Sequence, residues 1–187
     1  PNGSIYANYA TSQQPPGGAT LELSNAANNA NNPIFDPQKA RTAELGTKWE
    51  LAGGNLLLSG ALYETRVGNE VIVDPADSTV YIQTGEKRVR GIELGAIGRI
   101  TDAWSVSAGF TSMDNDVAQG PVVTADGSTG LSYTPRNAFT SWTSYDFGNG
   151  LTIGGGARYN GRMHRGTDGA VGTPAYTEAY WVADAMA

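Results

Sequence analysis

The densest group of chemically active side chains in this sequence is a basic run. Within the stretch GEKRVRGIELGAIGRI, residues 85–100, the basic residues are Lys87, Arg88, Arg90 and Arg99. A cluster of this kind is typical of a solvated face or of a binding site for a polyanion. The stretch then alternates, with Ile92, Leu94 and Ala96 at every second position. That alternation predicts a strand with one apolar face.

Motifs for catalysis or metal binding are scarce. The chain contains no cysteine and a single histidine, His164, which excludes thiolate chemistry, multi-histidine metal sites and the HExxH motif. The glycine-rich GGGAR at 154–158 lacks the Lys-Ser/Thr pair of a phosphate loop, and DNDVAQG at 114–120 lacks the closing Glu of a calcium loop. No Ser, His and Asp are spaced like a nucleophile with its base. We predict no enzyme, no metal site and no directly bound cofactor.

Composition narrows the class of protein further. The net charge of −6 argues against a nucleic-acid partner. Charged residues make up only 16% and glycine accounts for 25 of 187 residues, a profile poor in helix formers. No apolar run approaches the roughly 18 residues of a transmembrane helix. Transmembrane strands need only alternating segments of about ten residues, so they stay compatible with this sequence.

Alternating residues predict an all-β chain. The expected strands lie near residues 4–12, 38–51, 56–67, 80–100, 104–114, 131–147, 151–163 and 175–187. Three strands alternate clearly, at 44–51, 104–110 and 151–159. One face of the first carries Leu45, Thr47, Trp49 and Leu51, and one face of the second carries Trp104, Val106, Ala108 and Phe110. At 56–67 leucines fall on both faces, and we expect Leu57, Ala61 and Tyr63 to point outward.

The connections between the expected strands alternate in length. Short turns lie at 52–55, 101–103 and 148–150, and long polar segments lie at 13–37, 68–79, 115–130 and 164–174. In an up-and-down antiparallel sheet, all the short turns then share one edge. Outer-membrane barrels have this organisation, with short periplasmic turns and long extracellular loops. The sequence therefore predicts an up-and-down antiparallel transmembrane β-barrel.

Aromatic residues gather at two levels of the expected strands. Those beside the short turns are Trp49, Trp104, Tyr145 and Phe147, and those towards the long loops are Tyr63, Phe110 and Tyr159. Aromatic girdles of this kind flank the apolar band of a transmembrane barrel. We predict that the first four side chains lie at a membrane interface.

The residues of the opposite strand face indicate a wide barrel. Small barrels are filled by side chains, whereas this face carries Gly46, Gly109, Gly154 and Gly156 among charged residues. The chain starts at the lip of a strand and stops inside YWVADAMA at 180–187. Edge strands left open there would expose unpaired backbone groups. We expect residues 1–187 to form one contiguous section of a larger barrel domain.

Four stretches together resemble the barrel of TonB-dependent outer-membrane siderophore receptors. They are GSIYANYATSQQPPG at 3–17, DPQKARTAELGTKWEL at 36–51, GEKRVRGIELGAIGRITDAWSVSAGFTSMDND at 85–116 and YTPRNAFTSWTSYDFGNGLTIGGGARYNG at 133–161. The resemblance implies a barrel of about 22 strands, of which the eight here are roughly the thirteenth to twentieth. It also implies that the plug domain and the remaining strands lie outside these 187 residues.

The resemblance further implies the location, ligand and partners. The protein is expected in the bacterial outer membrane, among lipid and lipopolysaccharide, importing ferric siderophores of the catecholate or a related type with energy from TonB. TonB would act through the plug segment. A ferric triscatecholate is anionic and aromatic, so arginine, lysine, tyrosine and tryptophan suit it. The candidate ligand contacts are Arg66, Tyr81, Arg136, Arg162, His164 and Arg165, with the cluster RMHRG at 162–166 favoured.

Two other readings of the sequence stay open at this point. One is a small eight-stranded outer-membrane barrel with a structural or enzymatic role. The other is a soluble, ligand-binding β-sandwich, although Greek-key connections would disturb the alternation of turns and loops.

Overall fold

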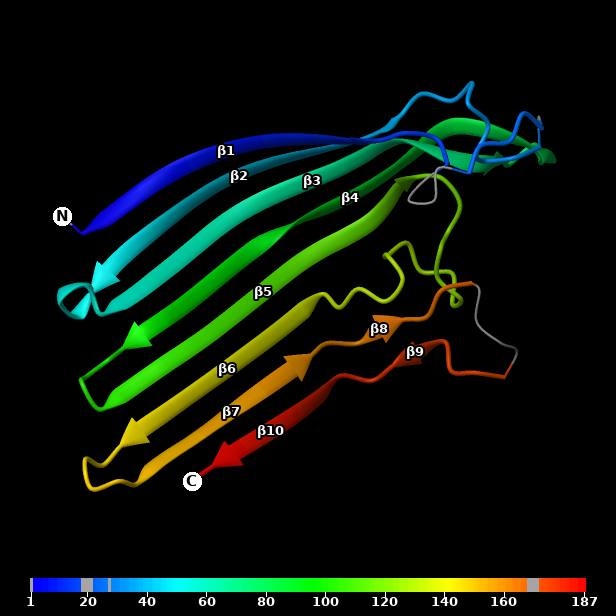
Figure 1. Cartoon of the computed structure of the whole chain (residues 1–187). Coiled ribbons are helices and arrows are strands. Elements are labelled where there is room, and N and C mark those ends of the chain that lie inside the picture. The colour runs from blue at the N-terminus through cyan, green and yellow to red at the C-terminus, as the bar shows by residue number, and fades with distance from the viewer. Residues whose placement is uncertain (1, 18–21, 27, 168–171) are drawn as a thin grey trace.

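The computed structural model describes residues 2–17, 22–26, 28–167 and 172–187 as one large curved, antiparallel sheet, with a small two-stranded sheet and loops at one end (Figure 1). The strands are β1 (Gly3–Gln14), β2 (Gln38–Leu51), β3 (Leu56–Asp74), β4 (Asp77–Arg99), β5 (Trp104–Gln119), β6 (Asn137–Asp146), β7 (Thr152–Asn160), β8 (Met163–His164), β9 (Tyr176–Thr177) and β10 (Tyr180–Met186). A one-turn 3₁₀ helix, η2 (Ala52–Gly54), joins β2 to β3. None of the helices in these ranges is long and apolar enough to cross a membrane.

The large sheet has the predicted up-and-down topology. Its strand order is β1-β2-β3-β4-β5-β6-β7-β10, so each strand pairs with its neighbours in the chain apart from the small β8–β9 hairpin. The short turns after β2, β4 and β6 lie along one edge, and the long connections lie at the other (Figure 1). At one short turn Gly98 has a φ of 137°, and a Cβ there would lie 2.0 Å from the carbonyl oxygen of Asn55. Glycine is required where two backbones approach so closely.

The structure differs from the predicted strands at several places, and one of them is β5, which runs to Gln119 beyond its expected end at 114. The segment 68–79, expected as a loop, continues the β3–β4 ladder as far as Asp74 and Asp77, with register shifts on the way. Its β-branched run VIV at 71–73 favours pairing over a loop. Residues 131–136, expected as the start of a strand, lie outside β6, since Tyr133 has a φ of 56° that interrupts an extended chain. The β8–β9 hairpin was not expected.

The register of the sheet separates two faces of different chemistry. Leu62 of β3 lies opposite Ile92 of β4, and Leu94 of β4 lies opposite Phe110 of β5. The face that they share, here called the apolar face, includes Ile5, Leu45, Trp49, Leu58, Leu62, Ile92, Leu94, Ala96, Trp104, Val106, Ala108, Phe110, Phe139 and Ile153. The polar face carries Glu44, Lys48, Glu93, Arg158 and Asp184, together with Gly46, Gly109, Gly154 and Gly156.

The predicted orientation of the strand at 56–67 is wrong. Tyr63 and Ala61 lie opposite Gly91 and Glu93, on the polar face, and Leu57 has the same parity. Leucines at both parities made the pattern ambiguous, and the pairing with β2 and β4 decides it. Tyr63 therefore does not belong to an aromatic girdle on the apolar face.

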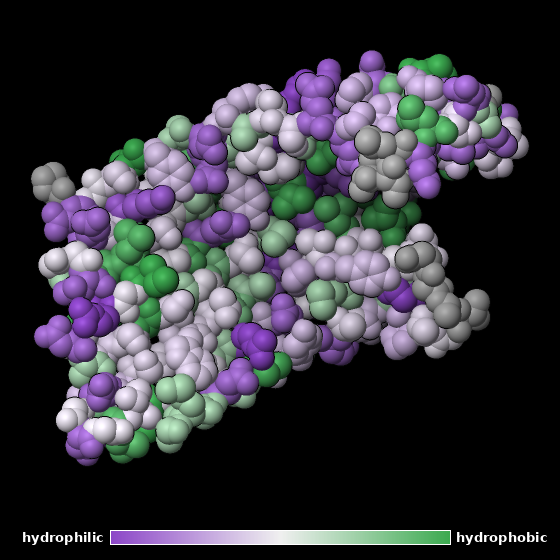
Figure 2. Space-filling model, viewed as in Figure 1, coloured by the Kyte–Doolittle hydropathy of each residue, from purple (hydrophilic) through white to green (hydrophobic). Residues whose placement is uncertain are grey.

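The sheet has no hydrophobic core of its own in the part of the chain that is described. No hydrophobic side chain there is buried, while Leu62 is 58% and Leu94 53% exposed. Such a surface is far larger than a soluble protein leaves exposed, but it suits a wall whose apolar face meets hydrocarbon. Figure 2 shows the molecule hollowed at the long-loop end, between the tip of the β3–β4 hairpin and the loops after β5 and β7.

Candidate functional site

A pocket of about 410 Å³ opens at the long-loop end of the sheet, between the β5–β6 connection and the segment that follows β7. Its lining includes three of the predicted ligand contacts, Arg136, Arg162 and His164. The other lining residues are Asn115, Ser128, Thr129, Gly130, Leu131, Thr134, Asn137, Tyr159 and Gly161. Two loops far apart in the sequence thus bring these side chains together.

Backbone hydrogen bonds hold these two loops against each other. The amide of Ala125 donates to the carbonyl oxygen of Arg165 at 2.9 Å, and that of Tyr133 donates to the carbonyl oxygen of His164 at 2.8 Å. An isolated bridge between Thr124 and Gly166 adds to the contact. These contacts hold the chain carrying RMHRG against its neighbour, so backbone hydrogen bonds fix the two walls of the pocket.

His164 is part of this connection between the loops. Its Nδ1 lies 2.7 Å from Oδ2 of Asp126, and both side chains are partly exposed. The backbone N–H of Ser128, with His164, lowers the pKa of Asp126 to about 2, so the carboxylate stays charged above that pH. Among the described residues there is no group of three His, Asp or Glu side chains that could hold a metal ion.

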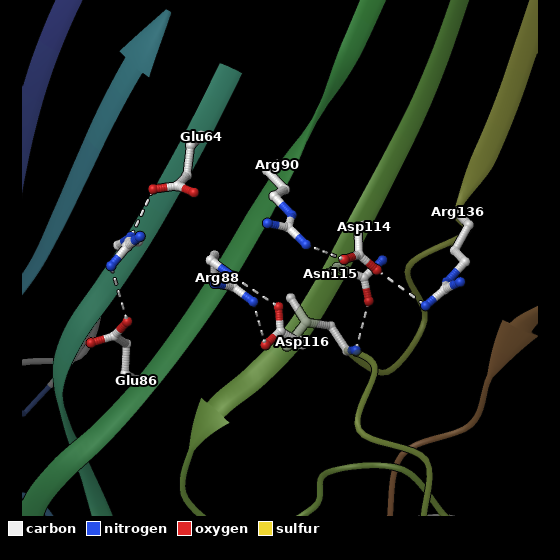
Figure 3. Close-up of polar contacts among 10 residues, drawn as sticks. Glu64, Glu86, Arg88, Arg90, Asp114, Asn115, Asp116 and Arg136 are labelled. Atoms are coloured by element: carbon white, nitrogen blue, oxygen red, sulfur yellow. Dashed lines mark hydrogen bonds and ion pairs between the residues drawn. The ribbon is translucent and has the colours of Figure 1, made fainter. Parts of the chain in front are cut away.

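Arg162 and Arg136 both lie at the pocket but have different partners. The Arg162 guanidinium pairs with Glu178 at 3.0 Å and lies 4.4 Å from the centre of the Tyr176 ring. Arg136 is 3.1 Å from Asp114, a carboxylate that also pairs with Arg90 (Figure 3). The Arg136 side chain is 74% exposed, so it can turn towards a ligand at little cost.

The other three predicted contacts lie elsewhere. Arg165 donates to the carbonyl oxygens of Pro174 at 3.1 Å and Gly166 at 3.4 Å, within its own loop. Arg66 is on β3 beside Glu64, and Tyr81 lies on the extended β3–β4 hairpin opposite Val73. The structure does not bring these three into the pocket, and their contact with a ligand stays a prediction.

Asn115 is a pocket residue that sequence reasoning missed. It is only 4% exposed, and its Oδ1 accepts a 2.8 Å hydrogen bond from the amide of Leu131. Its Nδ2 has no hydrogen-bond partner in the described part of the chain. The segment DNDVAQG at 114–120, which we expected to be a solvated loop, instead continues β5 as far as Gln119. A buried amide with a free N–H adds a directional donor for an oxygen-rich ligand.

The predicted interface aromatics lie at the short-turn edge. Trp49 and Trp104 are on the apolar face, and Trp104 lies opposite Tyr145. Tyr145 packs edge-on against Phe147 with ring centres 4.9 Å apart, and Nε1 of Trp104 donates to Thr143 at 2.7 Å. A second group of rings lies nearer the long loops, where Trp181 contacts Phe139 and Tyr159. The position of the first group, at the short-turn edge, suits the role at the membrane interface that we predict for it.

Comparison with known proteins gives one consistent result. The family model described as TonB dependent receptor-like, beta-barrel matches residues 1–187. The catecholate siderophore receptor Fiu of Escherichia coli K12 is 50% identical over 186 residues, covering 98% of this chain and 24% of that protein. The probable TonB-dependent siderophore receptor PiuA of Acinetobacter baumannii is 36% identical and is covered to 26% of its length.

Solved structures agree with these sequence matches. The closed form of the ferric-catecholate import receptor Fiu from E. coli K12 superposes with a TM-score of 0.92 at 50% identity, over 98% of this chain and 26% of that one. The PiuA structure gives a TM-score of 0.79 at 35% identity, over 98% and 27% of the two chains. The chain spans about a quarter of these relatives. It belongs to the TonB-dependent receptor β-barrel family of the Gram-negative outer membrane, and it forms a section of that barrel.

Proposed function

We propose that this chain is the wall and part of the extracellular ligand site of a receptor that binds ferric siderophores and imports them with energy from TonB. The observation that carries the proposal is the pocket at the long-loop end, where Arg136, Arg162 and His164 meet the buried amide of Asn115. Its donors and cations match an anionic, oxygen-rich ligand.

The names of the relatives support a catecholate ligand. Fiu is named a catecholate siderophore receptor and PiuA a probable siderophore receptor. A ferric catecholate presents negative charge and aromatic rings together. Arg162 lies 4.4 Å from the centre of the Tyr176 ring. The pair offers a cation for the negative charge of the ligand and an aromatic side chain for its rings.

The polar and apolar faces of the sheet suggest the remaining partners of the receptor. The polar face would line the lumen and hold a plug domain, through which TonB acts, and the apolar face would contact outer-membrane lipid and lipopolysaccharide. The alternative of a closed eight-stranded barrel is disfavoured. β1 and β10 do not pair with each other in the described residues, and the matched relatives are siderophore receptors.

Ligand binding by the full-length receptor tests this function. We expect the double variant Arg136→Gln/Arg162→Gln to raise the Kd for a ferric catecholate about tenfold or more, since charged hydrogen bonds contribute roughly 1.5–3 kcal/mol each. Binding is measured by quenching of tryptophan fluorescence, and import by uptake of radioactive iron into cells.

The matched control is Arg99→Gln, at the short-turn edge of β4. It removes one arginine charge, half of what the double variant removes, from the opposite end of the wall and should leave the Kd unchanged. An unchanged Kd in the double variant, with the melting temperature preserved, would place the ligand on other loops.

A further inference from the structure

The apolar face changes character on the way to the long loops. On β2, β3 and β4 the register puts Arg41 opposite Arg66, and Arg66 opposite Arg88. Three arginines therefore lie side by side in one cross-strand row, here called the arginine row. They share the face of Leu45, Leu62 and Ile92, and each lies four residues farther along its strand. At 3.3 Å per residue this is about 13 Å nearer the long loops.

Such a row is unfavourable within the protein itself. Like charges directly opposite each other on a sheet destabilise it, because their Cβ atoms are only about 4.5–5.5 Å apart. Arg66 offsets this partly by pairing with Glu64 at 2.7 Å and with Glu86 at 4.0 Å. Arg88 does so by a two-pronged contact with Asp116 at 3.2 and 3.3 Å (Figure 3). Arg41 is exposed and has no ion pair in the described part of the chain.

The positive charge is concentrated towards β2. Lys39 is on the same face as Arg41, two residues away, and it likewise has no ion pair within the described ranges. Lys39, Arg41 and Arg66 line a hollow of about 370 Å³, with Glu86 as the acidic lining residue. The carboxylates Asp114 and Asp116 lie on β5, at the opposite side of the row. The β2 side is thus left with two unpaired cations.

We propose that Lys39, Arg41 and Arg66 bind a phosphate group of lipopolysaccharide in the outer leaflet. The row lies just beyond the apolar band, where hydrocarbon gives way to phosphorylated sugar headgroups. Guanidinium groups bind phosphate in a forked geometry, and a phosphate between Arg41 and Arg66 relieves their repulsion. The inference rests on the proposed contact of the apolar face with lipopolysaccharide and not on siderophore binding.

The test compares lipopolysaccharide bound by the full-length receptor and by the variant Arg41→Gln/Arg66→Gln. Each protein is purified in detergent, stripped of lipid and titrated with rough-type lipopolysaccharide. We expect the apparent Kd to rise about tenfold or more in the variant, since each cation near an anionic headgroup surface contributes roughly a factor of five. Dephosphorylated lipopolysaccharide should bind the native receptor as weakly as the intact glycolipid binds the variant.

A matched variant and a second ligand complete the design. Lys48→Gln/Arg158→Gln removes two cations from the polar face and should leave lipopolysaccharide affinity unchanged. The inference is overturned if Arg41→Gln/Arg66→Gln binds like the native receptor, or if inorganic phosphate alone competes as well as the glycolipid. It is also overturned if that variant loses ferric-catecholate affinity while keeping lipopolysaccharide. Failure of the siderophore proposal alone would leave the glycolipid titration unaffected.

Discussion

The apolar face has two zones built on the same strands. From Ile92 to Ala96, β4 presents aliphatic side chains, whereas at Arg88 and Arg90 it presents charges on that same face. Backbone pairing continues without a break from one zone to the other on β2, β3 and β4 down to Lys87. The membrane boundary is therefore marked by side-chain chemistry and not by the ends of strands.

The largest expected effect comes from placing a charge in the aliphatic zone. Ala108 of β5 lies opposite Ala96, between Trp104 and the charged zone. Ala108→Arg should lower the free energy of unfolding by about 2–4 kcal/mol, the cost of arginine near the bilayer midplane. Urea-dependent unfolding of the receptor in phospholipid vesicles measures it. Ser107→Arg, one residue away on the polar face, should cost much less, and equal costs would mean that the faces are assigned wrongly.

A smaller effect is expected when arginine is placed nearer the long loops on the same strand, β5. Ser112 lies opposite Ile92 and two residues from Asp114. Ser112→Arg should cost about 0–1 kcal/mol in the same unfolding measurement, because the penalty for arginine declines towards the interface. A cost as large as that of Ala108→Arg would move the boundary of the hydrocarbon above Ser112.

The smallest expected effect is in the arginine row. In detergent without lipopolysaccharide, Arg41→Gln should leave the free energy of unfolding unchanged or raise it by a few tenths of a kcal/mol, since it removes a charge opposite Arg66. Thermal unfolding followed by circular dichroism gives the sign. A loss above about 1 kcal/mol would show that Arg41 stabilises the sheet, beyond what an exposed substitution usually does.

Alternation within single strands made much of the fold predictable. The faces of the strands at 44–51 and 104–110, and the order of short turns and long loops, follow from residue types and spacing alone. Local patterns failed where the pairing with neighbouring strands decides which face of the sheet a residue takes. Tyr63 was placed on the wrong face because leucines occur at both parities of its strand, and only pairing with Gly91 resolves this.

The site was predictable in part, for a related reason. The cationic residues of RMHRG were found from their type, but their roles depend on distant partners. Arg165 is held by carbonyl oxygens of its own loop, whereas Arg162 lies at the pocket. The arginine row joins positions 41, 66 and 88, whose alignment depends on the length of two hairpins. Neither arrangement has a local sequence signal.

The β3–β4 hairpin makes the wall uneven in height. β4 has 23 residues, or about 76 Å of extended chain, against 9 residues and about 30 Å for β7. Its tip at Asp74–Asp77 is closed by its own ladder and lies at the far end of the molecule from the short turns (Figure 1). In the receptor proposed above, this tip would stand farther from the bilayer than the other described loops, so it is the place to insert a tag for surface labelling.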